Sequence, residues 1–186
     1  MQILAGKYKG RRLQSTPSPR VRPTARRLRE SLFEVLGPRI EHSRFLDLCS
    51  GSGAVGIEAL SRGAGHATFV DRSAKMCNFV RSNLELCDVP PEQFVVVEAE
   101  ASHFLSTLKV EIVGWWDVIY FDPPYSTDYS SIIEVISTSG ILKKKRSILV
   151  VEHSVENPLS DRLSLLYRWR VIRQGESYLS FYERKK

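Results

Sequence analysis

A glycine-rich segment and the acids around it are the first residues in this sequence that could do chemistry. Residues 51–56 read Gly-Ser-Gly-Ala-Val-Gly, which matches the pattern Gly-x-Gly-x-x-Gly, and Asp71 lies twenty residues after Gly51. Glycines let a backbone approach a ligand closely, and an acid at this spacing is typical of ribose binding. The segment therefore predicts a site for a ligand that contains a nucleoside.

Asp47 changes which ligand of this kind is favoured. Its carboxylate precedes Gly51 by four residues, beside the place where a dinucleotide would put its pyrophosphate, and like charges there repel. S-adenosylmethionine has no phosphate and carries a sulfonium and an ammonium group, which a carboxylate attracts. The acid favours S-adenosylmethionine over a nicotinamide or flavin dinucleotide, and a tight turn without any ligand is the structural alternative.

The segment Asp122-Pro123-Pro124-Tyr125 is the second candidate site. Two consecutive prolines stop both sheet pairing and helix formation, so the segment should be a stiff turn. The Asp122 carboxylate and the Pro123 carbonyl could each accept one N–H bond from an exocyclic amine on a base, which would direct the nitrogen lone pair at a methyl donor. Tyr125 could stack on that base. We expect all four residues to be catalytic, and a purely structural Pro-Pro turn is the alternative.

The basic charge of the chain is concentrated at its N-terminal end. The net charge is +6, with ten basic and two acidic residues in 1–40 and seventeen and nineteen in 41–186. This favours a polyanion such as nucleic acid as partner, because each neutralised phosphate releases counterions, and a solvated basic face is the alternative. The residues predicted to bind the nucleic acid are Lys7, Tyr8, Lys9, Arg11, Arg12, Arg22 and Arg26.

Length and composition describe a chain able to form one globular unit. With 186 residues, 42% of them hydrophobic, it can bury a core without disulfides or metal, which excludes intrinsic disorder. The 3 cysteines show no Cys-x-x-Cys spacing and the 4 histidines are scattered, so neither a metal site nor a histidine-based hydrolase is indicated. Membrane-span and signal-peptide patterns are also missing. We expect a protein of the cytoplasm that uses no metal.

Alternating strand and helix patterns surround the candidate sites. Such alternation with short connections is typical of a doubly wound α/β fold with a mostly parallel sheet, whose ligands bind at the carboxyl ends of the strands. The last two β-type runs are separated only by residues 174–176 and predict an antiparallel edge hairpin. Strands are expected at 45–48, 67–70, 94–97, 117–121, 147–152, 167–173 and 178–182, and helices after Pro23-Thr24, through Ala59-Leu60, and at 73–86, 102–108 and 129–137.

Taken together, these residues resemble a known family. The matching blocks are residues 3–13, Arg22-Pro23-Thr24 with 29–33, 46–48 with 51–64, 122–125, and Gly175 with 179–182. They resemble the RsmD-type small-subunit ribosomal RNA guanine-N2 methyltransferases, within the Rossmann-like S-adenosylmethionine-dependent methyltransferases. The resemblance covers nearly the whole chain, and its first block is absent from generic methyltransferases.

The resemblance implies methylation of the exocyclic N2 amine of one guanine in 16S-type ribosomal RNA, within an assembled or partly assembled small subunit. It implies a Rossmann-like class I methyltransferase fold with a seven-stranded sheet in residues 41–186, and a basic N-terminal extension, residues 1–40, in which a hairpin over 2–13 and a helix pack on that core. We expect a monomer. The donor-binding residues would be Asp47, Ser50, Gly51, Ser52, Gly53, Asp71, Arg72, Glu100 and Ala101.

The chain departs from the family pattern at three places. Members often have Phe-Ala where this chain has Cys49-Ser50, and Ser or Thr followed by Asp where it has Ala25-Arg26. The second change removes an acid and adds a base beside the donor pocket, so no donor contact is assigned there. Glu100 stands at a position that is often Asp or Asn, which keeps an acceptor on a longer side chain.

Other functions stay open at this point. A DNA adenine-N6 methyltransferase also uses Asp-Pro-Pro-Tyr, but generally needs a target-recognition domain for which 186 residues leave no room. A protein glutamine methyltransferase usually has Asn in place of Asp122. A dinucleotide-dependent oxidoreductase would need a second substrate domain and would leave residues 122–125 without a role. Loss of Asp122 or Gly53 would indicate a noncatalytic RNA-binding module, and both are present.

Overall fold

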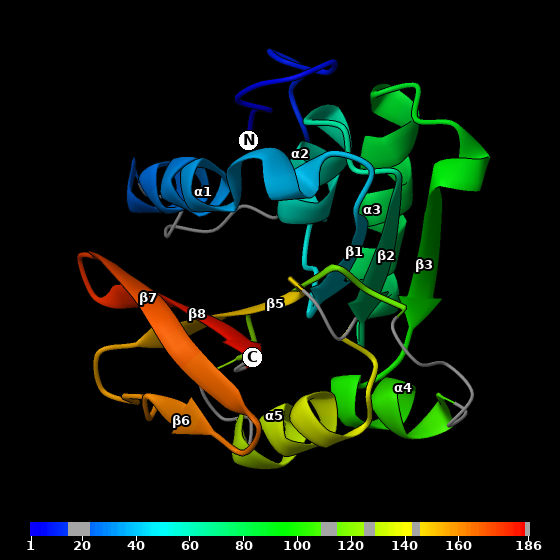
Figure 1. Cartoon of the computed structure of the whole chain (residues 1–186). Coiled ribbons are helices and arrows are strands. Elements are labelled where there is room, and N and C mark those ends of the chain that lie inside the picture. Colours follow the sequence, from blue (N-terminus) through cyan, green and yellow to red (C-terminus); the bar gives the residue numbers. More distant parts are fainter. Residues whose placement is uncertain (15–22, 109–114, 125–128, 143–145, 185–186) are drawn as a thin grey trace.

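The computed structural model describes residues 1–14, 23–108, 115–124, 129–142 and 146–184, and these form one sheet of eight strands (Figure 1). The strands are β1 Arg44–Leu48, β2 His66–Asp71, β3 Phe94–Glu98, β4 Val118–Phe121, β5 Ile148–Ser154, β6 Arg162–Leu163, β7 Leu166–Gln174 and β8 Ser177–Arg184. Their order is β3-β2-β1-β4-β5-β8-β7-β6, with the first five parallel and the last three antiparallel to their neighbours. The order reverses between β1 and β4, where ligands bind in such sheets.

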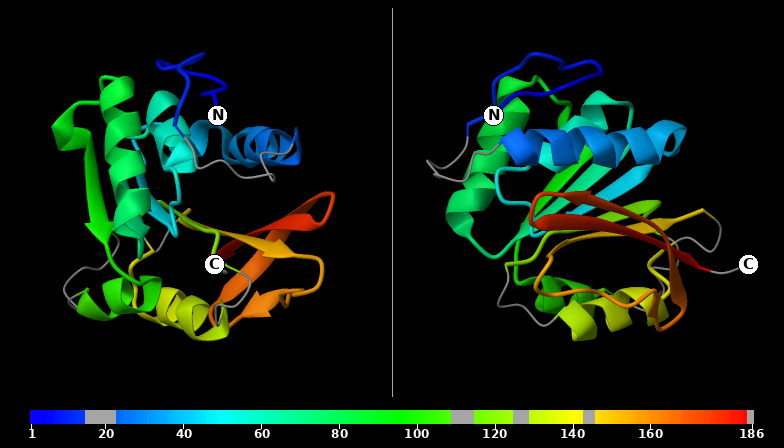
Figure 2. Two further views of the ribbon diagram at one scale, coloured as in Figure 1. Left: turned by 180° about the vertical axis from the view of Figure 1, so that it is seen from behind. Right: turned by 90° about the vertical axis from the view of Figure 1, so that its left-hand side faces the viewer.

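Helices cover both faces of the sheet. The described α-helices are α1 Pro23–Leu36, α2 Ala54–Ser61, α3 Ala74–Leu86, α4 Ala101–Thr107 and α5 Tyr129–Thr138, with the 3-10 turns η1 Gly37–Ile40 and η2 Pro91–Gln93. Helices α1, α2 and α3 contribute to one hydrophobic core, and α4 and α5 to a second core on the opposite face (Figure 2). Within the described ranges, none of the helices is long and apolar enough to cross a membrane.

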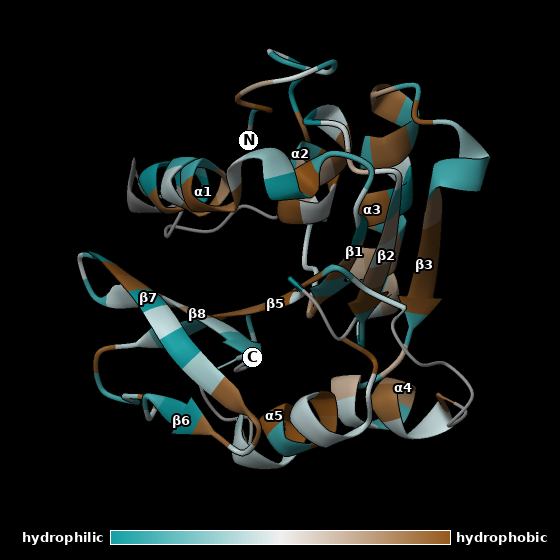
Figure 3. Ribbon diagram, viewed as in Figure 1, coloured by the Kyte–Doolittle hydropathy of each residue, from teal (hydrophilic) through white to brown (hydrophobic). Residues whose placement is uncertain are grey.

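Strand alternation decides which side chains reach which core. In β1, Phe45 packs in the core under α1 to α3, whereas Leu46 and Leu48 pack in the core with α4 and α5. Asp47 therefore points to the α1 side, as does Tyr120, its register partner in β4. Figure 3 shows hydrophobic residues along β3 and β5 and hydrophilic ones in the middle of β7, near the sheet edge.

The predicted doubly wound fold is confirmed, with one strand more than expected. The seven expected strands are present, and the hairpin of β7 and β8 joins the parallel part through β8. The eighth strand, β6, has two residues that pair with Tyr167 and Leu166. A run of two residues is too short to show the alternation that predicts a strand.

The expected hairpin over residues 2–13 is present as a short antiparallel loop, without regular strands on its two sides. The N-terminal arm, defined as residues 1–14, is a loop closed by one antiparallel bridge between Gln2 and Arg12. Ile3 accepts the N–H of Gly10 at 3.0 Å, and Gly6 and Gly10 have φ values of +81° and +88°. These two left-handed glycines allow the chain to reverse direction within the arm.

A buried carboxylate of α2 fastens the arm to the core. Glu58 is 0% exposed, and its two oxygens accept the backbone N–H of Leu4 at 2.8 Å and of Ala5 at 3.0 Å. Arg62 donates to the same carboxylate at 2.9 Å, and Arg29 of α1 lies 3.8 Å from it. Four groups from three segments therefore surround this one side chain.

Asn83 of α3 links the arm to the glycine-rich turn. Its amide nitrogen donates to the carbonyls of Gln14 and Ser52, both at 2.9 Å, and its oxygen accepts the N–H of Gln14 at 2.7 Å. At Gly6 a side chain would come within 1.8 Å of the Ser61 carbonyl, so the arm lies directly against α2. Buried residues of 1–40 and 41–186 share one core, and the division at residue 40 stays a prediction.

Candidate active site

Two pockets lie at the C-terminal ends of the parallel strands and meet at Cys49 and Asp122, which line both. The α1 pocket has a volume of about 220 Å³ and the α4 pocket one of about 290 Å³. Residues from all the predicted motifs line them. The α1 pocket includes Arg29, Asp47, Ser50, Gly51, Ser52, Tyr120 and Glu152, and the α4 pocket includes Asp71, Arg72, Glu100, Ala101 and Pro124.

Asp71, at the end of β2, holds the glycine-rich turn against the α4 pocket. One carboxylate oxygen accepts the N–H of Gly51 at 2.8 Å and the other accepts the N–H of Ser73 at 2.9 Å. Each oxygen keeps a lone pair for a further donor such as a ribose hydroxyl. Exposed Arg72 donates to Glu100 at 3.4 Å on the same pocket. The four residues predicted for this part of the donor site thus share one cavity.

The later glycines of the motif are required by the turn and by packing. Gly53 is the N-cap of α2, with a φ of +75° that side chains rarely adopt. A Cβ at Gly56 would lie 2.3 Å from a ring carbon of Phe69 on β2. These glycines let α2 start abruptly and lie close to the sheet, which brings the turn to the strand ends.

Asp47 is a nearly unsupported charge in the α1 pocket. It is 1% exposed, and one of its oxygens accepts the N–H of Gly56 at 2.8 Å. Burial raises the pKa of Asp47 to about 7 and the nearby Asp71 adds to this, while the Gly56 hydrogen bond opposes it. A buried carboxylate is costly without a cation or several donors, so this position suits a positively charged ligand.

The Ser50 hydroxyl, on the same pocket as Asp47, also lacks a hydrogen-bond partner among the described residues. The backbone N–H of Ser50 is fixed by the Val70 carbonyl at 2.9 Å, and its hydroxyl is buried. Buried hydroxyls are normally paired. A carboxylate and an unpaired hydroxyl lining one pocket fit the ammonium-bearing end of S-adenosylmethionine, and the adjoining α4 pocket offers acceptors for its ribose.

Cys49 separates the two pockets and does not act as a nucleophile. It takes a left-handed φ of +70°, which turns the chain between β1 and the glycines. Burial raises the pKa of its thiol to about 12, and the carboxylates of Asp122, Asp71 and Asp47 add to this. The thiol therefore stays protonated at neutral pH.

The turn after β4 places Asp122 on both pockets. Pro123 is buried and its carbonyl accepts the Tyr129 hydroxyl at 3.4 Å, which orients that carbonyl and leaves it a free lone pair. Pro124 is exposed on the α4 pocket. Tyr125 lies outside the described residues, so its stacking role stays a prediction.

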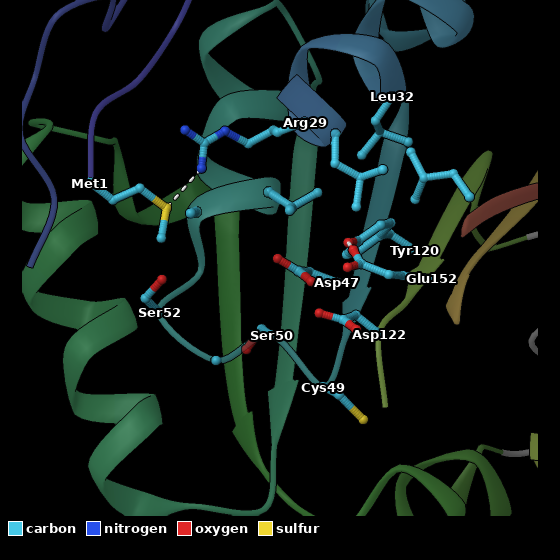
Figure 4. A pocket seen from close by; sticks show the side chains of 15 residues that line it. Met1, Arg29, Leu32, Asp47, Cys49, Ser50, Ser52, Tyr120, Asp122 and Glu152 are labelled. Carbon is cyan, nitrogen blue, oxygen red and sulfur yellow. Dashed lines mark hydrogen bonds between the residues drawn. The ribbon is translucent and has the colours of Figure 1, made fainter. Parts of the chain in front are cut away.

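Tyr120 and Glu152 are site residues that the sequence motifs did not reveal. The Tyr120 hydroxyl donates to Glu152, and both side chains lie next to Asp122 and Asp47 (Figure 4). Enclosure by protein raises the pKa of Asp122 well above its usual range, and the carboxylates of Glu152 and Asp47 add to this, although Asp122 keeps surface open to the pockets. The sequence did contain one sign of Glu152, because this acid follows an apolar run that predicts a strand.

Arg29 is a third residue that pattern reasoning missed. It is 7% exposed, and its guanidinium donates to the Met1 sulfur at 2.8 Å and to the Gln2 carbonyl at 2.7 Å. Burial lowers its pKa, and Glu58 opposes that change. This cation lines the α1 pocket, but its charge is engaged by the arm and by Glu58.

The predicted nucleic-acid contacts are mostly on the surface, and one is wrong. The Tyr8 side chain is 5% exposed within the core, because its backbone N–H is held by the Ser61 hydroxyl at 2.9 Å, so it cannot stack on a base. Arg11 is exposed but already paired with Asp88 at 3.0 Å. Arg22 lies outside the described residues. Arg26 is likewise exposed and paired with Glu30 at 3.0 Å, and the other exposed members of the set are Lys7, Lys9 and Arg12.

Known proteins share this fold and sequence over the full length. The family model described as conserved hypothetical protein 95 matches residues 1–183. The Bacillus subtilis protein named "Putative rRNA methyltransferase YlbH" is 31% identical over 185 residues, 100% of both chains. Ribosomal RNA small subunit methyltransferase D of Escherichia coli K12 is 32% identical over 160 residues, 86% of this chain and 77% of that one.

A solved structure is also similar to this chain in fold and in sequence. The structure described as "Putative methyltransferase yhhF from Escherichia coli" has a TM-score of 0.86 at 29% identity and covers 100% of this chain and 98% of its own. The family resemblance seen in the motifs is confirmed. The chain belongs to the conserved hypothetical protein 95 family, the family of the RsmD-type methyltransferases.

Proposed function

We propose that this protein transfers a methyl group from S-adenosylmethionine to the exocyclic N2 amine of a guanine in small-subunit ribosomal RNA. The observation that carries the proposal is the position of Asp122, which lines both the pocket suited to a nucleoside donor and the pocket beyond it. The names of the relatives support ribosomal RNA as the substrate. We also propose that the protein acts as a monomer on an assembled or partly assembled subunit.

Acidic side chains would hold the donor. Asp71 lines the α4 pocket, where its oxygens can accept hydrogen bonds from ribose hydroxyls, and Glu100 and Ala101 on the same pocket would lie near the adenine. Asp47 and the Ser50 hydroxyl lie on the other side of Cys49, where a cationic amino-acid end would gain most from a buried carboxylate. When bound, S-adenosylmethionine supplies a methyl group made electrophilic by a sulfonium.

Asp122 and the Pro123 carbonyl would prepare the amine. An amine on a base is a poor nucleophile because its lone pair is delocalised into the ring. Two acceptors that each take one N–H bond favour a tetrahedral nitrogen and point the lone pair away from the ring. The amine becomes cationic once it has taken the methyl group, and it then loses a proton readily, so the chain needs no strong base. Positioning and electrostatics provide the catalysis.

The target base must leave its stack to reach this site. Asp122 lies in a recess between two pockets, and paired bases cannot enter such a recess unless they flip out. Exposed Lys7, Lys9 and Arg12 on the arm can bind phosphates and hold the surrounding RNA. The metal-free reaction stays a prediction, and among the described residues no group of three His, Cys, Asp or Glu could hold a metal ion.

The proposal is tested by methyl transfer from radiolabelled S-adenosylmethionine to small ribosomal subunits from cells that lack this enzyme. Naked ribosomal RNA and duplex DNA are assayed alongside, and the labelled nucleosides are identified. Label in N2-methylguanosine from ribosomal RNA is the expected result. Label only in N6-methyladenine from DNA would establish the adenine alternative. Absence of both label and donor binding would reopen the dinucleotide hypothesis.

A further inference from the structure

Glu152 has no role in the reaction described so far, yet it lies in the α1 pocket beside Asp122. Strands β4 and β5 are in parallel register, with Phe121 paired to Val151, so Asp122 and Glu152 are the next residues along two neighbouring strands. Both line the same cavity. Holding the amine requires only Asp122 and the Pro123 carbonyl, which leaves the second carboxylate unexplained.

The neighbouring negative charges make the carboxylate of Glu152 destabilising for the empty protein. Asp47, Asp122 and Glu152 line one pocket, and the cation there, Arg29, is engaged by Glu58 and the arm. Glu152 accepts one hydrogen bond within the described residues, from Tyr120. Clustered carboxylates with few donors destabilise a fold, so a ligand that brings N–H groups would be strongly favoured here.

The amines of the nucleobases differ in what lies beside them. In adenine and cytosine the ring nitrogen next to the exocyclic amine on the Watson–Crick edge is an acceptor. In guanine that neighbour, N1, carries a hydrogen and is a donor. A flipped base is read by hydrogen bonds to this edge, so two adjacent carboxylates match guanine and repel the other two bases.

We propose that Glu152, held in place by Tyr120, accepts the N1–H of the target base while Asp122 holds its amine, and that this pair selects guanine. The inference rests on the proposed function, because it assigns a specificity residue to that site. Tyr120 acts as a positioning residue. It is buried, lies opposite Asp47 in the register, and its hydroxyl donates to the Glu152 carboxylate.

The test compares guanine with 2-aminopurine at the mapped target position, in an RNA fragment or in a subunit reconstituted with ligated RNA. The analogue keeps the 2-amino group but lacks both the N1 hydrogen and the O6 oxygen, so the change of the ratio between wild type and variant reports the N1 contact. Wild-type protein should methylate guanine about 100-fold faster or more, since sites built around a hydrogen bond reject analogues that lack it. Glu152→Gln offers an amide N–H to the bare N1, so the preference for guanine should fall at least about tenfold.

Three further measurements keep the test decisive. Tyr120→Phe retains the carboxylate but not its support, and should lower the preference for guanine less than Glu152→Gln does. Glu156→Gln changes an exposed acid outside both pockets and should leave rates and preference unchanged. Donor affinity, measured by calorimetry, reports whether each variant keeps a folded site.

The outcomes separate this inference from the proposed function. If Glu152→Gln lowers the rates on both bases equally and leaves their ratio unchanged, the role of Glu152 is overturned. Formation of N2-methylguanosine by the wild type would still support the proposed function in that case. If the wild type yields no N2-methylguanosine but labels adenine, the proposed function fails first and this inference fails with it.

Discussion

The molecule holds carboxylates in two regions, one buried under the arm and one that faces the pockets, and their hydrogen-bond partners differ. Under the arm, Glu58 is surrounded by the N–H groups of Leu4 and Ala5 and by Arg62, within hydrogen-bonding distance. At the strand ends, Asp122 and Glu152 line the same pocket. Among the described residues, the Tyr120 hydroxyl donates a hydrogen bond to Glu152. The first arrangement satisfies a charge and the second leaves charges in need of partners.

This difference indicates what each region is for. A buried charge with matched donors stabilises one arrangement of the chain, and removing it leaves several donors unpaired. Neighbouring carboxylates with few donors repel one another in the empty protein, and a ligand that supplies N–H groups or positive charge relieves this repulsion. We therefore expect substitutions under the arm to change folding, and substitutions at the strand ends to change binding and catalysis.

The largest effect is expected at Asp122. Asp122→Ala should lower the single-turnover rate of methyl transfer by about 10³-fold or more, because the amine loses a fixed acceptor. Donor affinity, measured by calorimetry, should change by less than about threefold, since Asp122 is assigned to the amine. Equal loss of donor binding and rate would remove the amine-positioning role. Glu156→Ala, at an exposed acid outside both pockets, is the control.

Next in size is the loss of Glu58. Glu58→Ala should lower the free energy of unfolding by about 3–5 kcal/mol, because it leaves a buried arginine and backbone donors uncompensated. Urea denaturation gives this value, and hydrogen exchange should show lost protection at the Leu4 and Ala5 amides. Glu134→Ala, at an exposed position of α5, should change stability little. A small effect at both sites would contradict the contrast drawn above.

A smaller effect is a pH dependence from Asp47. Its pKa is raised from 3.8 to about 7, so the folded state binds this proton more tightly. The resulting stability is complete below the unfolded pKa and is lost as pH rises through about 7. Asp47→Asn should therefore gain stability over wild type between pH 5 and pH 8, by about 2–4 kcal/mol at most. Parallel thermal-unfolding curves across that range would refute the shift.

The smallest effect is expected from the surface charges of the arm. Replacing Lys7, Lys9 and Arg12 together by Ala should weaken RNA binding by roughly one to two orders of magnitude at low salt and reduce the salt slope by about 2–3. Stability should be unchanged, since these side chains are exposed. Arg11→Ala is a matched control, because its guanidinium is already paired with Asp88. An unaltered salt slope would mean that the arm only supports the fold.

Local patterns were enough to predict the sheet and half of the site. Short apolar runs between turns predicted seven strands, and Gly51, Asp71 and Asp122 reach the strand ends because parallel strands end together. Glu152 and Arg29 could not be found in this way, since their approach to Asp47 depends on register between strands and on how α1 crosses the sheet. Tyr8 was misread because a lysine-flanked tyrosine gives no sign of the buried α2 contacts that cover it.

The two hydrogen bonds donated by Asn83 have a consequence for the proposed binding of RNA to the arm. One amide nitrogen is shared by the Gln14 carbonyl of the arm and the Ser52 carbonyl of the glycine-rich turn. Any displacement of the arm by RNA must stretch one of these bonds or carry the turn along with it. Linkage is reciprocal, so a donor that tightens the turn would change the affinity for RNA by the same factor. Under the proposed function, donor binding and RNA binding would therefore be energetically coupled through Asn83.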